Sequence, residues 1–321
     1  MPTEYQAQIL ELDLPAQESL RNDQERCSAD PLQLRSIGRA VGQQVRIVRA
    51  DRPEYFALYT IAQQNPPAGF DDRCRASIVR TGLTGHQRLG TADETGGMVQ
   101  ADVVDAAPPR EGPRFFEVAE DAGCRGYCVV IAPHGGEIEK RTDDEAMHFG
   151  RALAWSRLAA TVWICKGFGD GLAGAFDRWH ITSTDLHPAS FPKLRRIARR
   201  KFQHGIAFHG FARKPGESDV YIGGGASESL KAEIRSALED SGLPLEIRVA
   251  TEADDPKFQG RSRDNLINRL AAQGIHIEQS AKARTFDLQI ATVLAGVYRC
   301  PDRVDFSSQA RTDAGVRLST T

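Results

Sequence analysis

Six short apolar runs in the second part of the chain constrain its fold most. They are GYCVVIA at 126–132, TVWIC at 161–165, HGIAF at 204–208, DVYIG at 219–223, LEIRVA at 245–250 and GIHIE at 274–278. The first two are continuous apolar runs, which are typical of strands buried on both faces, and the other four indicate further strands. Helical patterns separate some of them, over 142–160, 226–241 and 285–297. The alternation predicts an α/β domain over 111–302, with a mixed, mostly parallel sheet flanked by helices.

The first 110 residues follow a different pattern. VRIVRA near 46–50, FALYTIA at 56–62 and ASIVR at 76–80 are short β-type runs. QQNPPAG at 63–69 and TGLTGHQ at 81–87 are typical of turns. We therefore expect a small β-rich domain.

The domain boundaries follow from composition. Residues 1–34 are polar and of mixed charge, which predicts a polar arm before a β-rich domain at 35–110. The proline-rich segment DAAPPREGPR at 105–114 marks the end of that domain. The Ser-, Thr- and Asp-rich residues 303–321 are predicted to be a flexible tail.

Composition excludes several classes of function. The 321 residues contain 41 Lys and Arg against 43 Asp and Glu, a net charge of −2, which disfavours a nucleic-acid-coating polycation. A stretch of about 18 apolar residues, as a membrane-spanning helix requires, is absent from the sequence. The acidic N-terminus does not have the pattern of a secretory signal, so we expect a cytoplasmic location. The six irregularly spaced cysteines suit reduced thiols.

Residues that could bind a metal ion or act as a general base stand at the ends of three predicted strands. His134 follows the first strand in IAPHGGEIE, with Glu137 and Glu139 close behind two glycines. His209 ends a second strand in AFHGF, and Glu278 ends a third. Imidazole and carboxylate are zinc ligands, and a nearby carboxylate suits a general base. A plain surface loop remains the alternative for the His-Gly-Gly segment.

The order and spacing of six motifs identify a relationship. The chain resembles the poly-γ-glutamate hydrolase family of bacterial and phage zinc-dependent hydrolases, whose fold is akin to that of zinc carboxypeptidases. The resemblance covers roughly 125–300. Its motifs are APHGGEIE (132–139), WHITSTD (179–185), AFHGF (207–211), DVYIGGG (219–225), NLINR (265–269) and GIHIEQSAKAR (274–284).

This resemblance implies a set of site residues. His134, Glu139 and His209 would bind zinc, and Glu278 would be the catalytic carboxylate. The family's loop usually has glycine at the position of Glu137. Zinc carboxypeptidases use a His and a Glu three residues apart, which would select Glu137 instead. We prefer Glu139, because its position in the loop matches the family.

The implied reaction is amide hydrolysis, in which zinc activates water and Glu278 moves the proton. Candidate substrate-binding residues flank the motifs: His180, Asn268, Arg269 and Arg284. Arginine suits a substrate carboxylate because its planar fork can bind both oxygens. The basic run LRRIARRK at 194–201 would steer an acidic polymer toward the site.

The sequence therefore predicts a zinc-dependent amidohydrolase that cleaves γ-glutamyl amide bonds. Its substrate would be poly-γ-glutamate or a smaller carboxylate-bearing amide, and its partners would include neither nucleic acid nor membrane. One alternative is a zinc hydrolase of N-acyl amino acids or peptides. The other is a non-catalytic, phage-associated binding protein that uses the β domain. As a phage-type protein, the enzyme would be released from the cytoplasm on lysis.

Overall fold

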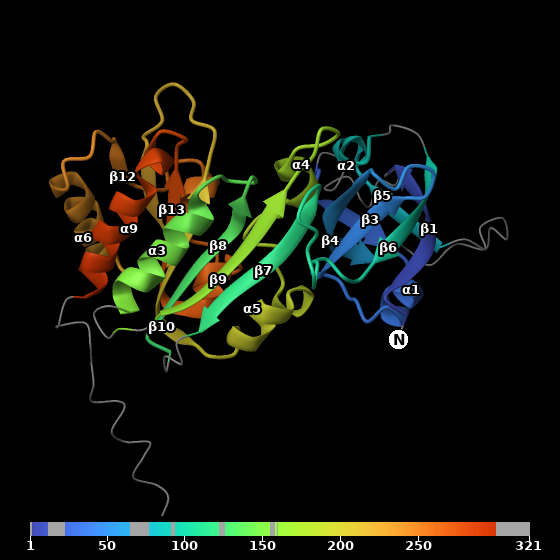
Figure 1. The fold of residues 1–321 in the computed structure, drawn as a ribbon, viewed down its shortest axis with the longest axis horizontal. Coiled ribbons are helices and arrows are strands. Elements are labelled where there is room, and N and C mark those ends of the chain that lie inside the picture. Colours follow the sequence, from blue (N-terminus) through green and yellow to red (C-terminus); the bar gives the residue numbers. More distant parts are fainter. Residues whose placement is uncertain are drawn as a thin grey trace, which may run out of the picture.

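The chain forms two sheets, which lie side by side in Figure 1. The computed structural model describes residues 2–11, 23–64, 77–90, 94–121, 126–154, 158 and 160–299. Six strands from the first hundred residues close into a barrel, and seven later strands form an open sheet. Residues 105–113 of the proline-rich segment lie between the last barrel strand and the first strand of the open sheet, and the domain boundaries themselves stay a prediction.

The barrel is built in the order β1-β5-β2-β4-β3-β6. Its strands are β1 (Glu4–Glu11), β2 (Arg26–Ala29), β3 (Gln44–Arg49), β4 (Phe56–Gln64), β5 (Ser77–Thr81) and β6 (Thr95–Gln100). Two short helices, α1 (Pro31–Ser36) and α2 (Leu83–Arg88), accompany it. The expected β-rich region is therefore present, and it is closed into a barrel.

Two predictions for this region were wrong. The expected polar arm over 1–34 contains β1 and β2. In β1, Tyr5, Ala7 and Ile9 point into the barrel while the residues between them are exposed. Apolar residues alternate with glutamine over 5–9, so the segment has a polar average although its period of two is that of a strand. The predicted turn at 81–87 is instead mostly helix α2, whose His86 is fully buried.

The open sheet is mixed and mostly parallel, as expected. Its order is β12-β11-β13-β10-β8-β9-β7, with antiparallel pairing only of β7 with β9 and of β11 with β13 among the described strands. The strands are β7 (Arg114–Asp121), β8 (Cys128–Gly136), β9 (Ala160–Phe168), β10 (Phe202–Gly210), β11 (Val220–Gly223), β12 (Ile247–Val249) and β13 (Ala271–Gln279). β7 was not predicted.

Helices cover both faces of this sheet (Figure 1). The helices are α3 (Thr142–Ala154), α4 (Ala175–Trp179), α5 (Pro192–Ile197), α6 (Glu228–Asp240), α7 (Pro256–Gln259), α8 (Leu266–Leu270) and α9 (Asp287–Tyr298), with 3-10 turns at Pro188–Ser190 and Ala283–Phe286. Alternate residues of β8 enter different cores: Val130 packs with α3, α6 and α9, and Ile131 packs with α4, α5 and α8. This alternation explains the continuous apolar run of β8.

The barrel packs against the second of these cores. Leu58 and Val103 from the barrel side share one apolar cluster with Phe115 and Trp179. The rings of Phe115 and Trp179 stack with centroids 5.2 Å apart, and Phe56 of β4 lies 5.3 Å from Trp179. Helix α4 therefore lies between the sheet and the barrel and contacts both.

The cysteines, the tail and the lack of a membrane-spanning stretch were also subjects of sequence-based expectations. The cysteines within the described residues, Cys27, Cys128 and Cys165, are free and buried. Those at 74, 124 and 300 and the predicted tail lie outside the described residues. Among the helices that the structure describes, none has both the length and the apolar character needed to cross a bilayer.

The placement of β1 can be tested by mutation. Ile9→Ala should lower the free energy of unfolding by about 2–5 kcal/mol, because Ile9 is fully buried in the barrel. The control Gln8→Ala, on the exposed face of the same strand, should change it by no more than about 0.5 kcal/mol. Urea denaturation measures both. Equal, small effects would show that β1 does not belong to the barrel core.

Candidate metal centre

A bulge at the end of β8 places His134. Ala132 pairs with Ile164 of β9 and Gly135 pairs with Lys166, so Pro133 and His134 together face Cys165. A bulge of this kind redirects a side chain. Gly135 and Gly136 make it possible: a Cβ on Gly135 would lie 2.5 Å from that of Asp143, and Gly136 has a φ of +72°.

A closed turn then returns the chain to His134. The backbone N–H of Glu139 donates to the carbonyl of His134 at 2.8 Å, and the N–H of Glu137 donates to Gly167 at 2.8 Å. Thr142 Oγ1 donates to the Glu139 carbonyl at 2.9 Å and holds the turn against the start of α3. The carboxylate of Glu139 is thereby buried beside the His134 ring.

Strand register supplies the other residues. In the parallel pairing of β10 with β13, His209 lies directly opposite Glu278. The side chain of His276, two residues before Glu278, is on the same face of β13, and its Nε2 lies 3.0 Å from Glu278 Oε1. His209, His276 and Glu278 are all buried.

Three side chains with electron-rich atoms converge at this edge of the sheet. The Nδ1 atoms of His134 and His209 are 3.3 Å apart. Glu139 presents Oε1 at 3.1 Å from the first and Oε2 at 3.5 Å from the second. Ligand atoms of these three residues all lie within 4.8 Å of one another, so the group could hold a metal ion.

The hydrogen bonds around the rings favour a cation between them. His134 Nε2 lies 2.9 Å from the carbonyl of Ile181, which can only accept, so Nε2 carries a hydrogen. In a neutral ring Nδ1 is then a lone pair that faces the Glu139 carboxylate and the ring of His209. Such an arrangement needs a proton or a metal ion, and an outer carbonyl partner of this kind is usual for metal-binding histidine.

Burial and charge shift the pKa values of these groups. For His134, burial lowers the pKa, but the charge and hydrogen bond of Glu139 raise it more, so the net shift is upward. For Glu139, burial raises the pKa, but His134 and His209 outweigh this and hold it well below its usual range. Burial and the neighbouring His276 lower the pKa of His209. Neutral His209 and ionised Glu139 are the forms that bind metal.

These side chains line one cavity of about 380 Å³. The cavity is also lined by polar residues of two other segments, 180–184 and 257–265. The lining residues with ionisable or imidazole side chains are His134, Glu139, His180, His209, Lys257, Arg261, His276 and Glu278. The cavity therefore brings His180 and Glu278, predicted from sequence, together with the proposed metal ligands.

The two glutamates of the loop have different environments. Glu139 is buried against both histidines, whereas Glu137 is exposed and its Oε2 accepts the backbone N–H of Gly169 at 3.1 Å. The closed turn directs these side chains to opposite sides. The geometry supports the preference for Glu139 over Glu137 as a ligand.

Three predicted substrate-binding residues do not line the cavity. The Asn268 amide donates to the carbonyls of Gly260 and Ser262 and accepts from the Gly225 N–H, so it braces loops. Arg269 donates to the Leu186 carbonyl. The Arg284 guanidinium lies against Gly210, next to His209 in the chain, and its charge interacts with those of Glu139 and Glu278, although it does not line the cavity.

The basic run is also placed elsewhere. Arg195 and Arg196 line a separate cavity of about 1060 Å³, together with barrel residues such as Arg39 and Arg46. The run therefore does not line the metal cavity, and the steering of an acidic polymer by it stays a prediction. Helix α5, which carries the first four residues of the run, packs against β7, where the Leu194 N–H donates to Glu117 Oε1 at 2.9 Å.

Sequence reasoning missed other lining residues. For His276 a signal existed, because it precedes Glu278 by two residues on one strand face. Lys257 and Arg261 come from α7 and the loop after it, where no pattern marked them.

The choice between the glutamates predicts a difference in metal affinity. Glu139→Gln should weaken binding of a divalent transition metal by more than about 100-fold, since even the loss of an outer partner costs 10–100-fold. Glu137→Gln, two residues earlier in the same loop, should bind as the wild type does. Competitive titration with a chromogenic chelator measures both. The reverse ranking would make Glu137 the ligand.

Comparison with known proteins identifies the family of the chain. The model of the family described as poly-gamma-glutamate hydrolase matches residues 111–292, more than half of the chain. A search of curated proteins gave no significant match.

Three solved structures are similar to the chain at low identity. A bacteriophage poly-gamma-glutamate hydrolase is 18% identical, with a TM-score of 0.44 over 64% of this chain and 93% of that one. The zinc-free apo form of YNDL is 21% identical, with a TM-score of 0.40 over 60% and 90%. A metallo-carboxypeptidase from Pseudomonas aeruginosa is 11% identical, with a TM-score of 0.35 over 92% and 89%. By its family match, this chain belongs to the poly-gamma-glutamate hydrolase family.

Proposed function

We propose that the chain is a zinc-dependent amidohydrolase that cleaves γ-glutamyl amide bonds in poly-γ-glutamate. One observation carries this proposal: the donor atoms of His134, Glu139 and His209 converge in the same cavity as the buried carboxylate of Glu278. Membership of the family supports the substrate class.

Zinc suits the donor set. Two imidazole nitrogens and one carboxylate are the ligands of several catalytic zinc sites, which keep a further position open. His134, Glu139 and His209 would hold the ion. Zinc bound there would act as a Lewis acid, which polarises a carbonyl group and makes water more acidic.

Glu278 is proposed to move the proton. It accepts a proton from the attacking water as the water oxygen bonds to the amide carbon, and it returns that proton to the nitrogen when the C–N bond breaks. The ring of His276, 3.0 Å from Oε1, fixes the orientation of the carboxylate. Oε2 is the oxygen that we assign to the water.

Substrate contacts are assigned to the cavity wall and mouth. His180 presents Nε2 to the cavity, at 3.8 Å from Glu139 Oε1, where it can accept a hydrogen bond from a substrate N–H. Lys257 and Arg261 are the cationic side chains at the mouth, and both are more than a third exposed. They suit the free carboxylates of a γ-linked glutamate chain.

Removing the proposed base gives the first test of activity. Glu278→Gln should lower kcat on poly-γ-glutamate by roughly 10²–10⁴-fold, the usual range for general acid–base catalysis. Zinc content should stay at that of the wild type, because Glu278 is not a ligand in this proposal. The measurements are release of free amine from the polymer and elemental analysis of the purified chain. Glu137→Gln is the matched control and should retain activity.

The substrates in that assay separate the alternatives. α-Linked polyglutamate carries similar charge but lacks the γ bond, so the wild type should hydrolyse it far more slowly. If the wild type hydrolyses N-acyl amino acids or ordinary peptides faster than poly-γ-glutamate, these compounds and not the polymer are its substrates. A zinc-loaded chain that hydrolyses none of them would overturn the enzymatic proposal.

The cations at the mouth predict an effect on binding. Arg261→Ala should raise KM for the polymer by roughly 2–5-fold with little change in kcat, since an exposed ion pair is worth no more than about 1 kcal/mol. The effect should shrink in high salt. Arg235→Ala, which removes an exposed arginine of α6 that does not line the cavity, is the control. Equal KM values for the two variants would exclude this role for Arg261.

A further inference from the structure

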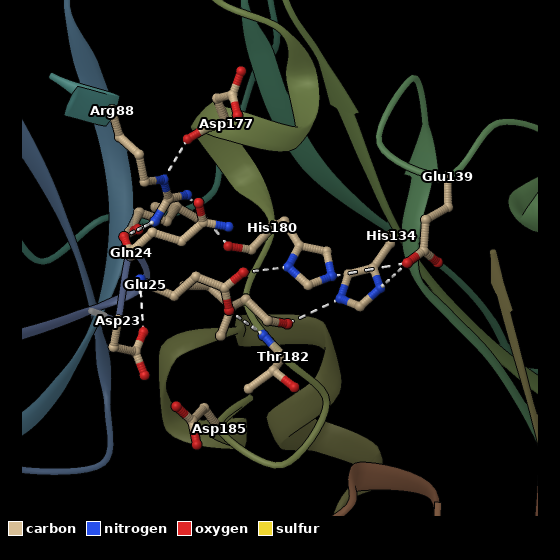
Figure 2. A network of polar contacts seen from close by, with 12 residues as sticks. Asp23, Gln24, Glu25, Arg88, His134, Glu139, Asp177, His180, Thr182 and Asp185 are labelled. Carbon is tan, nitrogen blue, oxygen red and sulfur yellow. Dashed lines mark hydrogen bonds and ion pairs between the residues drawn. The ribbon is translucent and has the colours of Figure 1, made fainter. Parts of the chain in front are cut away.

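The barrel contributes one buried carboxylate to the wall behind the cavity. Glu25 directly precedes β2, and its backbone carbonyl accepts the Thr60 N–H of β4 at 2.7 Å. Its backbone is thus part of the barrel, while its side chain, 8% exposed, points out of it toward His180 (Figure 2). Glu25 lies far outside residues 111–292, which match the family model.

Both oxygens of Glu25 contact the segment that carries His180. Oε1 lies in close hydrogen-bond contact with His180 Nδ1, and Oε2 accepts the backbone N–H of Thr182 at 2.7 Å. An ionised carboxylate can only accept. Burial raises the pKa of Glu25, but the hydrogen bond and charge of His180 and the charge of Arg88 outweigh it, and the net shift is downward. Nδ1 of His180 therefore carries the hydrogen.

The other side of the His180 ring faces the proposed metal centre. Nε2 lies 3.8 Å from Oε1 of Glu139. The ring is held between that of His134, with centroids 4.2 Å apart, and that of Phe176, stacked at 4.2 Å. Figure 2 shows the resulting row from Glu25 through His180 to His134 and Glu139.

We propose that Glu25 is a positioning residue of the active site: by accepting the Nδ1 hydrogen of His180, it fixes the ring so that Nε2 faces the substrate. This inference rests on the proposed function. It makes the barrel a part of the catalytic apparatus, which the family match does not include.

Hydrogen bonds of the neighbouring Arg88 hold the backbone near Glu25 and the backbone of His180 close to each other. Arg88, which ends α2 of the barrel, is 6% exposed and donates to four backbone carbonyls. Two belong to the barrel, Gln24 at 2.9 Å and Leu58 at 2.7 Å. The other two belong to the segment of His180: the His180 carbonyl at 3.3 Å and the Asp177 carbonyl at 2.5 Å. The residue before Glu25 and the backbone of His180 are therefore tied to one guanidinium group.

Without an acceptor at Nδ1, a neutral imidazole can place its hydrogen on either nitrogen. The carboxylate removes this choice and holds the ring plane, as outer-sphere carboxylates do for functional histidines. Loss of such partners typically lowers activity by 10–100-fold. The effect should therefore appear in kcat, and it should depend entirely on His180.

The test is a double-mutant cycle in the full zinc-loaded chain. Glu25→Gln should lower kcat on poly-γ-glutamate about 10–100-fold with KM within about 2-fold. In a His180→Ala background the same change should lower kcat by less than about 2-fold, because its target is gone. Glu25→Asp keeps the charge but shortens the reach, so it should also lose activity. It also serves as the second variant should Glu25→Gln fail to fold.

A control variant separates positioning from docking of the barrel. Arg26 donates to both oxygens of Asp185, at 2.7 and 3.0 Å, from the residue next to Glu25 to the segment that carries His180. Asp185→Asn weakens this contact without touching His180, and its kcat should stay within about 2-fold of the wild type. An equal loss in Asp185→Asn, or an equal effect of Glu25→Gln with and without His180, would overturn the proposal. Zinc loss in Glu25→Gln would do so too.

A spectroscopic readout does not depend on catalysis. The Nδ1 hydrogen of a histidine bound to a carboxylate gives a proton resonance far downfield of the amides. The wild type should show this signal, His180→Gln should lack it, and Glu25→Gln should shift it upfield. If the wild type hydrolyses no amide but shows this pattern, the proposed function fails and the pairing of Glu25 with His180 stands. A wild type without the signal refutes the pairing itself.

Discussion

The tight turn between His134 and Glu139 is the constraint on which the rest of the site depends. Backbone atoms approach so closely at Gly135 and Gly136 that a side chain fits at neither position. Because the turn closes with a hydrogen bond from Glu139 to His134, two donor groups from one segment meet without help from a distant element. β10 then adds His209, and the Gly210 N–H donates to Glu139 Oε2 at 3.0 Å, which fixes the carboxylate from the opposite side.

Around this turn, some site residues lie on regular strands and one, His180, lies on an irregular segment. The strands β8, β10 and β13 carry His134, His209 and Glu278, so the spacing of these groups follows from sheet register. His180 lies in a segment with little regular structure, between α4 and α5. This segment takes its shape from the barrel: Gln44, fully buried, donates to the Asp185 carbonyl at 2.7 Å and accepts the His187 N–H at 3.1 Å. A loop held this way can be as well ordered as a strand.

The sequence predicted what depends on local pattern. The buried strands of the open sheet are visible as short apolar runs, and the helices α3, α6 and α9 as apolar residues at helical spacing. His134, His209 and Glu278 stand at strand ends, where residues of neighbouring strands meet. The polar composition of 1–34 concealed β1, because only Tyr5, Ala7 and Ile9 mark its buried face. Asn268 and Arg269 were chosen for proximity to a motif, but their side chains bond backbone carbonyls outside the cavity. Glu25 lies 155 positions from His180, and no local pattern reports such a contact.

The position of Glu25 has a consequence for the order in which the site forms. Translation runs from the N-terminus, so all six barrel strands leave the ribosome before His180 does. Domains generally fold as units during synthesis, the first one earliest. The folded barrel can thus offer the Glu25 carboxylate, together with Arg88 and Gln44, to the segment of His180 before that segment has folded. In this sense the barrel is a template for a loop of the later sheet, because its side chains fix the conformation of the segment that carries His180.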